Sequence, residues 1–259
     1  MRYTIPGGRY PAAYDVITAA PHAFIAGCTG SGKSTMLHGL IYSLLARYSP
    51  ATVHLAFIDL KRVELCMYRK VAHCIGYANT EVAALQLLDA LHARMMERFT
   101  EMEKSGQTET EKPHIYLIFD EIGYFFARTG KQGVKALESI AMLGRAAHIH
   151  LVYACQNPRK SGPGAIPAGL LLNTPCRVAL RCVDKLESRL ILGIPGAELL
   201  PSFGDCIIST GVNLGRHSIP ATPPVELRRV VEHWANPGRY SPPEPEPRNR
   251  RRWYRRLFK

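Results

Sequence analysis

Short apolar runs alternate with longer amphipathic stretches along most of the chain. Residues 23–26 form an apolar run that enters a glycine-rich segment, and residues 35–48 follow it with a helical pattern. Two further runs, residues 115–119 and 149–155, are rich in β-branched and aromatic side chains. Runs this short and apolar are typical of strands that are buried on both faces of a parallel sheet. The pattern therefore predicts an α/β fold, with a mostly parallel sheet flanked by helices.

The chain has 259 residues, 46% of them hydrophobic, which is enough for one α/β domain with a large core. We expect a lead-in strand or hairpin over residues 1–20 and a single domain over residues 21–235. A proline-rich linker and a basic, aromatic tail are expected over residues 236–259. Prolines at the beginning of this last segment favour an extended linker.

Positive charge is concentrated at the carboxyl terminus. The net charge is +12, and residues 237–259 hold eight Lys or Arg against two Glu, a local excess of six. Arg250, Arg251 and Arg252 directly precede an aromatic pair. A tail of this composition binds nucleic-acid phosphates, lies on an anionic membrane surface, or remains solvated. The composition leaves all three readings open.

The cysteine pattern indicates a compartment. Seven cysteines are scattered along the chain without a C-x-x-C pair, and an odd, unpatterned set is typical of a reduced protein. No apolar run approaches the length that spans a membrane, and the first residues do not read as a signal peptide. We expect a cytoplasmic protein without a transmembrane segment.

Residues 27–34 read Gly-Cys-Thr-Gly-Ser-Gly-Lys-Ser, a complete G-x-x-x-x-G-K-S phosphate loop between the first predicted strand and helix. In this motif, backbone N–H groups and a helix N-terminus converge on the phosphates. Lys33 reaches the β- and γ-phosphate oxygens, and the Ser34 hydroxyl ligates Mg²⁺. The predicted ligands are therefore ATP and Mg²⁺. The predicted nucleotide-binding residues are Gly27, Thr29, Gly30, Ser31, Gly32, Lys33, Ser34 and Thr35.

Two carboxylates and one amide end the later strands. Asp120 and Glu121 follow residues 115–119, and Gln156 follows residues 149–155. The carboxyl ends of parallel strands meet at the ligand-binding edge of a sheet. There Asp120 is placed to hold Mg²⁺ with Ser34, and Glu121 to activate the attacking water. Gln156 is placed to contact the γ-phosphate or that water, so the pattern predicts ATP hydrolysis.

The order of the motifs strongly resembles the motor domain of the FtsK/SpoIIIE DNA translocases, over roughly residues 12–220. The segments that carry the resemblance lie at residues 21–27, 57–65, 96–99, 143–151, 154–158, 174–180 and 184–189. The resemblance implies a RecA-like P-loop NTPase that assembles into a homo-hexameric ring and moves double-stranded DNA through a central pore. It also implies an active site between subunits, completed by a neighbour's arginine. The matching position is Arg145.

The resemblance also implies DNA contacts from pore loops, and Lys185 matches one basic position. Where the family usually has Gln-Arg-Pro, this chain has Gln156-Asn157-Pro158, so an expected phosphate-binding arginine is absent. Arg159 and Lys160 follow at once and are candidates to replace it.

The membrane anchor, lower ring domain and winged-helix module of the cell-division members find no counterpart in this sequence. By analogy, this favours a motor of plasmids, phages or conjugative elements, working with a relaxase or a replication or transfer protein. The sequence therefore predicts an ATP-dependent DNA translocase. The alternatives are a type VII-like protein-export ATPase and an ATP-dependent switch that binds DNA without moving it.

Overall fold

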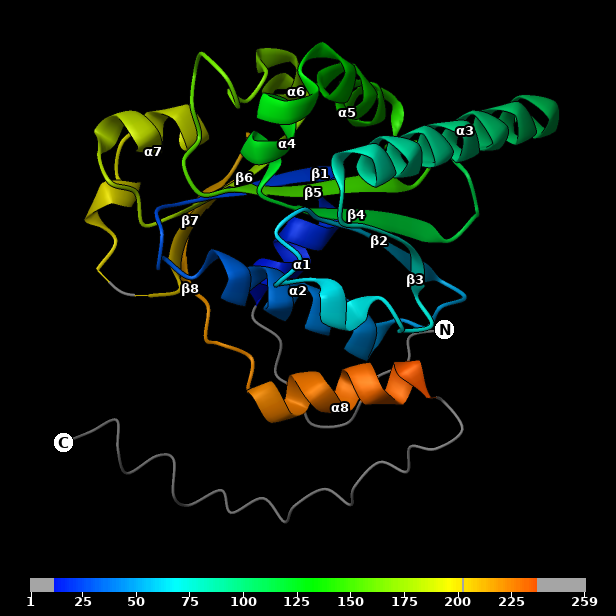
Figure 1. Cartoon of the computed structure of the whole chain (residues 1–259), viewed down its shortest axis with the longest axis horizontal. Helices are drawn as coiled ribbons and strands as arrows, with labels where there is room; N and C mark the ends of the chain where they lie inside the picture. Colours follow the sequence, from blue (N-terminus) through cyan, green and yellow to red (C-terminus); the bar gives the residue numbers. More distant parts are fainter. Residues whose placement is uncertain (1–11, 202, 237–259) are drawn as a thin grey trace.

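A single sheet runs through the molecule (Figure 1). The computed structural model describes residues 12–201 and 203–236 of the chain. Within these residues the strands follow the spatial order β3-β2-β4-β5-β1-β6-β7-β8. All pairs from β3 to β6 are parallel, whereas β7 and β8 are antiparallel. The predicted α/β class with a mostly parallel sheet is confirmed. The strands are β1 (His22–Ala26), β2 (Val53–Asp59), β3 (Cys74–Ala78), β4 (His114–Asp120), β5 (Ile149–Cys155), β6 (Cys176–Leu180), β7 (Asp205–Ser209) and β8 (Leu214–Ser218).

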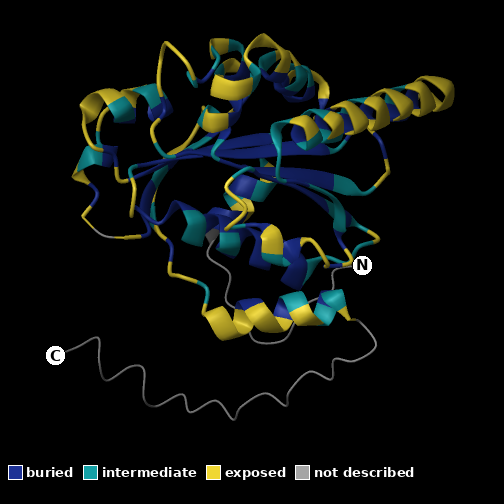
Figure 2. Cartoon of the chain, in the orientation of Figure 1, coloured by how far each residue is buried: buried dark blue, intermediate teal, exposed yellow. Residues whose placement is uncertain are grey.

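Helices cover both faces of the sheet (Figure 1). One face is covered by α1 (Ala12–Ala19), α2 (Lys33–Arg47) and, outside α2, α8 (Pro224–Ala235). The opposite face is covered by α3 (Glu81–Ser105), α4 (Ile122–Thr129), α5 (Lys131–Leu143), α6 (Ala168–Leu172) and α7 (Lys185–Leu192). Short 3-10 helices occupy Cys66–Tyr68 and Ala197–Leu199. Because helices lie on both faces, the central strands are buried along their whole length (Figure 2).

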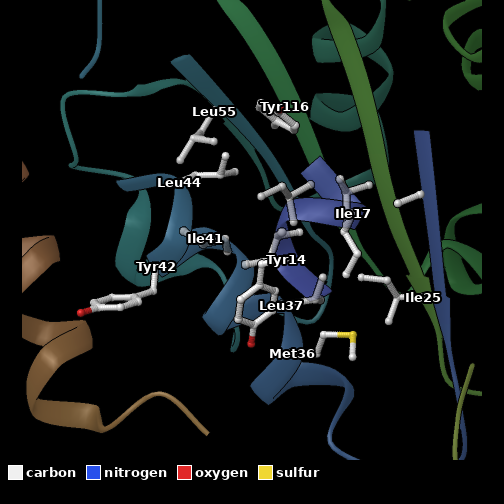
Figure 3. Packing of buried hydrophobic residues seen from close by; sticks show 14 of the residues in the cluster. Tyr14, Ile17, Ile25, Met36, Leu37, Ile41, Tyr42, Leu44, Leu55 and Tyr116 are labelled. Atoms are coloured by element: carbon white, nitrogen blue, oxygen red, sulfur yellow. The ribbon is translucent and has the colours of Figure 1, made fainter. Parts of the chain in front are cut away.

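Helix α2 is the most enclosed of the helices on its face. Its Met36, Leu37 and Ile41 pack in one cluster with α1 and the sheet (Figure 3). On its outer side, Trp234 of α8 donates its indole N–H to the carbonyl of Leu45 at 2.8 Å. Because α2 begins at the phosphate loop, this packing on two sides fixes the direction in which its N-terminus points.

On the opposite face, the long helix α3 presents a buried stripe at heptad spacing and extends past the sheet, where much of its surface is exposed (Figures 1 and 2). Thr80 caps its start by accepting from the Ala83 N–H, and Gly106 ends it at φ 68°. The polar member of the stripe is Arg98, only 5% exposed. Its guanidinium donates to the carbonyls of Ala147 at 2.5 Å and Pro113 at 2.9 Å, so it ties together the segments that enter β4 and β5.

The expected lead-in strand or hairpin is wrong for residues 12–19, which form α1; residues 1–11 lie outside the described part. Ala13, Tyr14 and Ile17 are buried at helical spacing and face α2. A Cβ on Gly39 of α2 would lie 1.8 Å from the Tyr14 hydroxyl, so a glycine there makes room for the ring. A two-residue alternation would have exposed half of these side chains.

The basic tail and the linker lie outside the described residues, apart from Asn236. Among the described helices, none has both the length and the apolar content required to cross a membrane.

Histidines gather at the amino edge of the sheet. His114 opens β4 and lies 2.8 Å, Nδ1 to Nε2, from His150 of β5, whose ring stacks on Tyr116. His22 opens β1 and accepts the N–H of Leu151 through Nδ1 at 3.0 Å. Burial lowers the pKa of His22 to about 4 and that of His150 to about 3. Both rings are therefore neutral in the folded protein across the physiological range.

These neutral histidines predict acid-dependent stability. Below about pH 6.5 the unfolded chain binds protons at His22 and His150, whereas the folded protein does not. The free energy of unfolding therefore falls as the pH drops from about 6.5 towards 4. Each group contributes a slope of about 1.4 kcal/mol per pH unit in that window. Urea unfolding at several pH values measures the slope. His150→Gln should reduce it by the contribution of one group, about 1.4 kcal/mol per pH unit. A free energy of unfolding that is constant from pH 7 to pH 5 would contradict this assignment.

Candidate active site

The phosphate loop connects β1 to α2 and depends on glycine at several positions. Gly30 and Gly32 adopt φ values of 76° and 104°, in the region that side chains disfavour. A Cβ on Gly27 would lie 2.7 Å from the Cβ of Leu180 in the neighbouring strand β6. The loop is held from the same side, because the Cys28 N–H donates to the carbonyl of Arg181 at 2.9 Å. The loop conformation is therefore set by its own sequence and by the end of β6.

Lys33 and Ser34 are the first two residues of α2, and the first turn of this helix contains no acidic residue. The positive end of the helix dipole and its unpaired N–H groups thus lie beside the lysine, which is suited to an anionic ligand. Lys33 is 4% exposed and forms an ion pair with Asp120, the 2% exposed last residue of β4. This pair joins the phosphate loop to the strand that carries the predicted magnesium ligand.

Glu121 follows at once and has a left-handed backbone, with φ 58°. For a residue other than glycine this conformation costs about 1–3 kcal/mol, and surrounding contacts must hold it. One carboxylate oxygen accepts the Gln156 N–H at 3.3 Å, and the other pairs with Lys61 Nζ at 3.0 Å. The structure therefore brings Glu121 and Gln156 together, as the sequence predicts, and holds the carboxylate from two sides.

The residues at this edge suit Mg²⁺. Ser34 and Asp120 supply hydroxyl and carboxylate oxygens, the hard donors that Mg²⁺ prefers. Asp59 pairs in register with Asp120, is fully buried, and has one carboxylate oxygen without a hydrogen-bond partner in the described part of the chain. In that same part, no group of three or more His, Cys, Asp or Glu forms a metal cage. The donor set is thus of the kind that binds Mg²⁺ together with phosphate oxygens from a nucleotide.

The remaining predicted residues lie elsewhere on the surface. Arg145 is exposed in the turn between α5 and β5, at the sheet edge opposite the phosphate loop. Arg159 and Lys160 are exposed in the connection between β5 and α6, which begins directly after Gln156. Lys185 is the exposed first residue of α7. Arg250, Arg251 and Arg252 lie outside the described residues.

Sequence reasoning gave no role to several residues that line this edge. Lys61 contacts Glu121, and Glu64 accepts a hydrogen bond from Ser34 at 2.8 Å. The exposed Phe203 lies against the loop, with ring atoms 3.4 Å from where a Cβ on Gly32 would be. A signal existed for Lys61 and Glu64, because both follow a strand that ends at the ligand edge of a parallel sheet. Phe203 had no such signal.

Comparison with known proteins agrees with the motifs. The model of the FtsK/SpoIIIE family matches residues 5–126. The chain is 32% identical over 242 residues to the DNA translocase FtsK of Tropheryma whipplei, covering 84% of this chain and 32% of that protein. It is 31% identical over 229 residues to the DNA translocase FtsK of Campylobacter jejuni, covering 82% of this chain and 24% of that protein.

The chain belongs to the FtsK/SpoIIIE family. It is a P-loop ATPase of FtsK/SpoIIIE type and spans a third or less of the length of these two relatives, 32% and 24%.

Solved structures share the fold of this FtsK/SpoIIIE motor domain. The monomer form of the pCW3 conjugation coupling protein TcpA with ATPγS has a TM-score of 0.72 at 22% identity, covering 83% of this chain and 65% of that one. The cytoplasmic domain of the type VII secretion ATPase EccC of Thermomonospora curvata has a TM-score of 0.68 at 24% identity, covering 86% and 28%. The predicted RecA-like P-loop NTPase fold is confirmed.

The geometry around Glu121 predicts a separation of binding from hydrolysis. Glu121→Gln keeps the shape of the side chain but removes the carboxylate that we expect to act as the base, so a fluorescent ATP analogue should bind within about twofold of wild type. Phosphate release should fall by about 10²–10⁴-fold, the usual contribution of a general base. Glu103→Gln, the same change at an exposed site on α3, should alter neither. Wild-type turnover in Glu121→Gln would remove Glu121 from the chemistry.

Proposed function

We propose that this chain is the motor of a double-stranded DNA translocase and works as a homo-hexameric ring in the transfer or segregation of a mobile element. The observation that carries the proposal is the set of Lys33, Asp120, Glu121 and Gln156 at one sheet edge, in a chain of this family. The names of the relatives support DNA as the substrate, because both matched proteins are DNA translocases.

At this edge the residues divide the work on ATP. Lys33 and the N-terminus of α2 bind the phosphates, and Ser34 and Asp120 would hold Mg²⁺, which neutralises phosphate charge when it is bound. Glu121 accepts a proton from the attacking water, which makes the water a better nucleophile. The Lys61 ammonium, 3.0 Å from this carboxylate, holds it in its orientation.

A role for Arg145 in a neighbouring subunit is supported by its location. Strand β5 has seven residues and runs from the Arg145 turn to Gln156, so about 20 Å separates the two ends. An arginine side chain does not span that length, and Arg145 therefore does not reach the phosphate loop of its own chain. The turn that carries it is braced, because the His148 N–H donates to the Arg145 carbonyl at 3.1 Å and Arg98 binds the Ala147 carbonyl. An arginine held in this way is suited to stabilise charge on a transferring phosphate.

Coupling to DNA is supported by the connection that follows β5. Glu121 accepts the backbone N–H of Gln156, and the exposed segment with Arg159 and Lys160 begins three residues later. A change of contact at Glu121 would therefore reach this basic segment directly. Lys185 and the tail arginines 250–252 are further proposed contacts with the phosphate backbone.

The setting of the motor is part of the same proposal. The pCW3 conjugation coupling protein TcpA shares the fold at 22% identity, and by analogy with it we propose DNA transfer with a relaxase or a replication or transfer protein as partner. All seven cysteines are free, which supports a reduced, cytoplasmic location. The tail is proposed to bind DNA, with lipid as its alternative target.

The main alternative is a protein-export ATPase, because EccC shares the fold. At 24% identity this likeness concerns the fold alone, so the response to substrate must separate the two. A third reading is a switch that binds DNA and hydrolyses ATP negligibly.

Linear duplex DNA should stimulate ATP hydrolysis tenfold or more, because translocation consumes ATP only when DNA engages the ring. Steady-state phosphate release with and without DNA measures this, with Glu121→Gln as the inactive control. A rate of ATP hydrolysis that is the same with and without DNA but rises with an export substrate peptide would favour protein export. Tight DNA binding with negligible turnover would favour the switch.

A mixing experiment tests the proposed interface. Arg145→Ala subunits keep an intact phosphate loop, whereas Lys33→Ala subunits keep an intact arginine, so mixed rings should regain part of the ATPase activity that each variant lacks alone. Arg94→Ala, at an exposed position of α3, should retain activity unmixed. Absence of recovery at every mixing ratio would assign Arg145 a role within its own subunit.

A further inference from the structure

The segment that follows β2 contacts the start of α2 through Glu64, and apart from Lys61 it has no role in the proposal so far. Strand β2 ends at Asp59, whose carboxylate accepts the Leu65 N–H at 2.9 Å and so folds the intervening residues into a tight turn. Arg62 within this turn has a left-handed backbone, with φ 61°. Strain of this kind persists only where surrounding contacts hold it, and it is frequent at functional sites. The turn presents Glu64 to the N-terminus of α2.

Glu64 is held by two side chains, and a third supports one of them. Ser34 Oγ donates to one carboxylate oxygen at 2.8 Å, and His38 Nε2 lies 3.2 Å from the other. His38 Nδ1 lies 2.6 Å from the hydroxyl of Tyr68, which is fully buried and stacks on Phe57. The chain of contacts therefore runs from the core, through a histidine one turn along α2, to the hydroxyl that the phosphate loop offers to a metal ion.

The chemistry of these groups fixes the direction of the hydrogen bonds to Glu64, and the tautomer of His38 decides the direction of the one to Tyr68. An ionised carboxylate only accepts, so both Ser34 and the His38 Nε2–H donate to Glu64. A neutral His38 that carries its proton on Nε2 accepts at Nδ1, so the Tyr68 hydroxyl donates to it. Burial raises the pKa of Tyr68, and its hydroxyl keeps this proton. In this tautomer, each donor in the series of contacts from Tyr68 to Glu64 has one acceptor.

For Ser34 the consequence is one of orientation. A serine hydroxyl has one proton and two lone pairs, and the proton is directed towards Glu64. The lone pairs are then free to face the site that Asp120 and the phosphate loop surround. Groups that orient a metal ligand from behind typically change metal affinity by about 10–100-fold when they are removed.

We propose that Glu64 is a positioning residue that directs the Ser34 hydroxyl towards Mg²⁺, and that His38 and Tyr68 hold Glu64 in that orientation. The inference rests on the nucleotide site of the proposed function, and it is independent of DNA. It assigns a role to residues 59–68, which link the core of the domain to the metal side of the phosphate loop.

The test is the effect of Mg²⁺ on nucleotide binding, measured without DNA and without turnover. Fluorescent ADP is titrated against the full chain in EDTA and then at increasing Mg²⁺. Glu64→Ala should raise the Mg²⁺ concentration for half-maximal binding by about tenfold or more. Affinity in EDTA should stay within about twofold, because the phosphate contacts of Lys33 are intact. The Mg²⁺ concentration for half-maximal binding of Glu64→Gln should lie between those of wild type and Glu64→Ala, because its amide oxygen still accepts from Ser34.

Two further variants make the test specific. In a Ser34→Ala background, Glu64→Ala should add less than about threefold, because the hydroxyl that it orients is absent. Glu109→Ala removes a comparable carboxylate, 3.1 Å from His148 at the far edge of the sheet, and should leave the Mg²⁺ requirement unchanged. Tyr68→Phe deletes only a hydroxyl and should raise the requirement less than Glu64→Ala does, which provides a readout if Glu64→Ala folds poorly.

The inference is overturned if Glu64→Ala and Tyr68→Phe bind nucleotide with the wild-type Mg²⁺ requirement. It is also overturned if Glu64→Ala is equally damaging with and without Ser34. A merely structural tie would lower the melting temperature and the affinity in EDTA together, without changing the Mg²⁺ requirement. Because DNA is absent from these assays, failure here leaves DNA-stimulated hydrolysis untouched, and absence of DNA stimulation leaves this test valid.

Discussion

The buried ion pair between Lys33 and Asp120 is the contact on which the rest of the site depends. Both side chains are almost fully removed from water, 4% and 2% exposed, so each charge requires the other. The pair fixes the start of α2 relative to the end of β4, although β5 lies between β4 and β1. Glu121 follows Asp120 directly, so its position is inherited from the same contact. A phosphate that enters the loop meets a lysine already in place, which lowers the ordering cost of binding.

Backbone strain marks the same functional regions. Among the described residues other than glycine, positive φ occurs at Arg62, Glu121 and His148. Arg62 belongs to the turn that presents Glu64, Glu121 is the proposed base, and His148 closes the turn that carries Arg145. Each conformation is held by hydrogen bonds from distant segments, such as the Gln156 N–H on Glu121. Contacts with the rest of the fold thus offset the strain of a few residues whose backbone conformations are locally unfavourable.

The fold and the centre of the site were predictable because their signals are local. Strands β1, β4 and β5 follow from short apolar runs, and the carboxyl-edge rule brings Asp120, Glu121 and Gln156 to one place. Helix α1 was missed because eight residues hold too few turns to separate a helical from a strand pattern, and its packing against Gly39 lies 25 positions from Tyr14.

The contact between Glu64 and Ser34 was out of reach for a related reason. It joins residues 30 positions apart through the fold of the turn after β2, and periodicity carries no information about that distance. The roles of Arg145, Arg159, Lys160 and Lys185 remain proposals, because they require a second subunit or DNA.

The separation of Arg145 from the phosphate loop has a consequence for symmetry. The arginine and the site that it would complete lie at opposite edges of the sheet. A pair related by a two-fold axis joins identical patches, whereas here unlike patches must meet. Subunits would therefore repeat head to tail, and an open array of any length would leave one arginine at one end and one site at the other without a counterpart. Only closure of the array into a ring makes every site equivalent, and an array that fails to close continues as a filament.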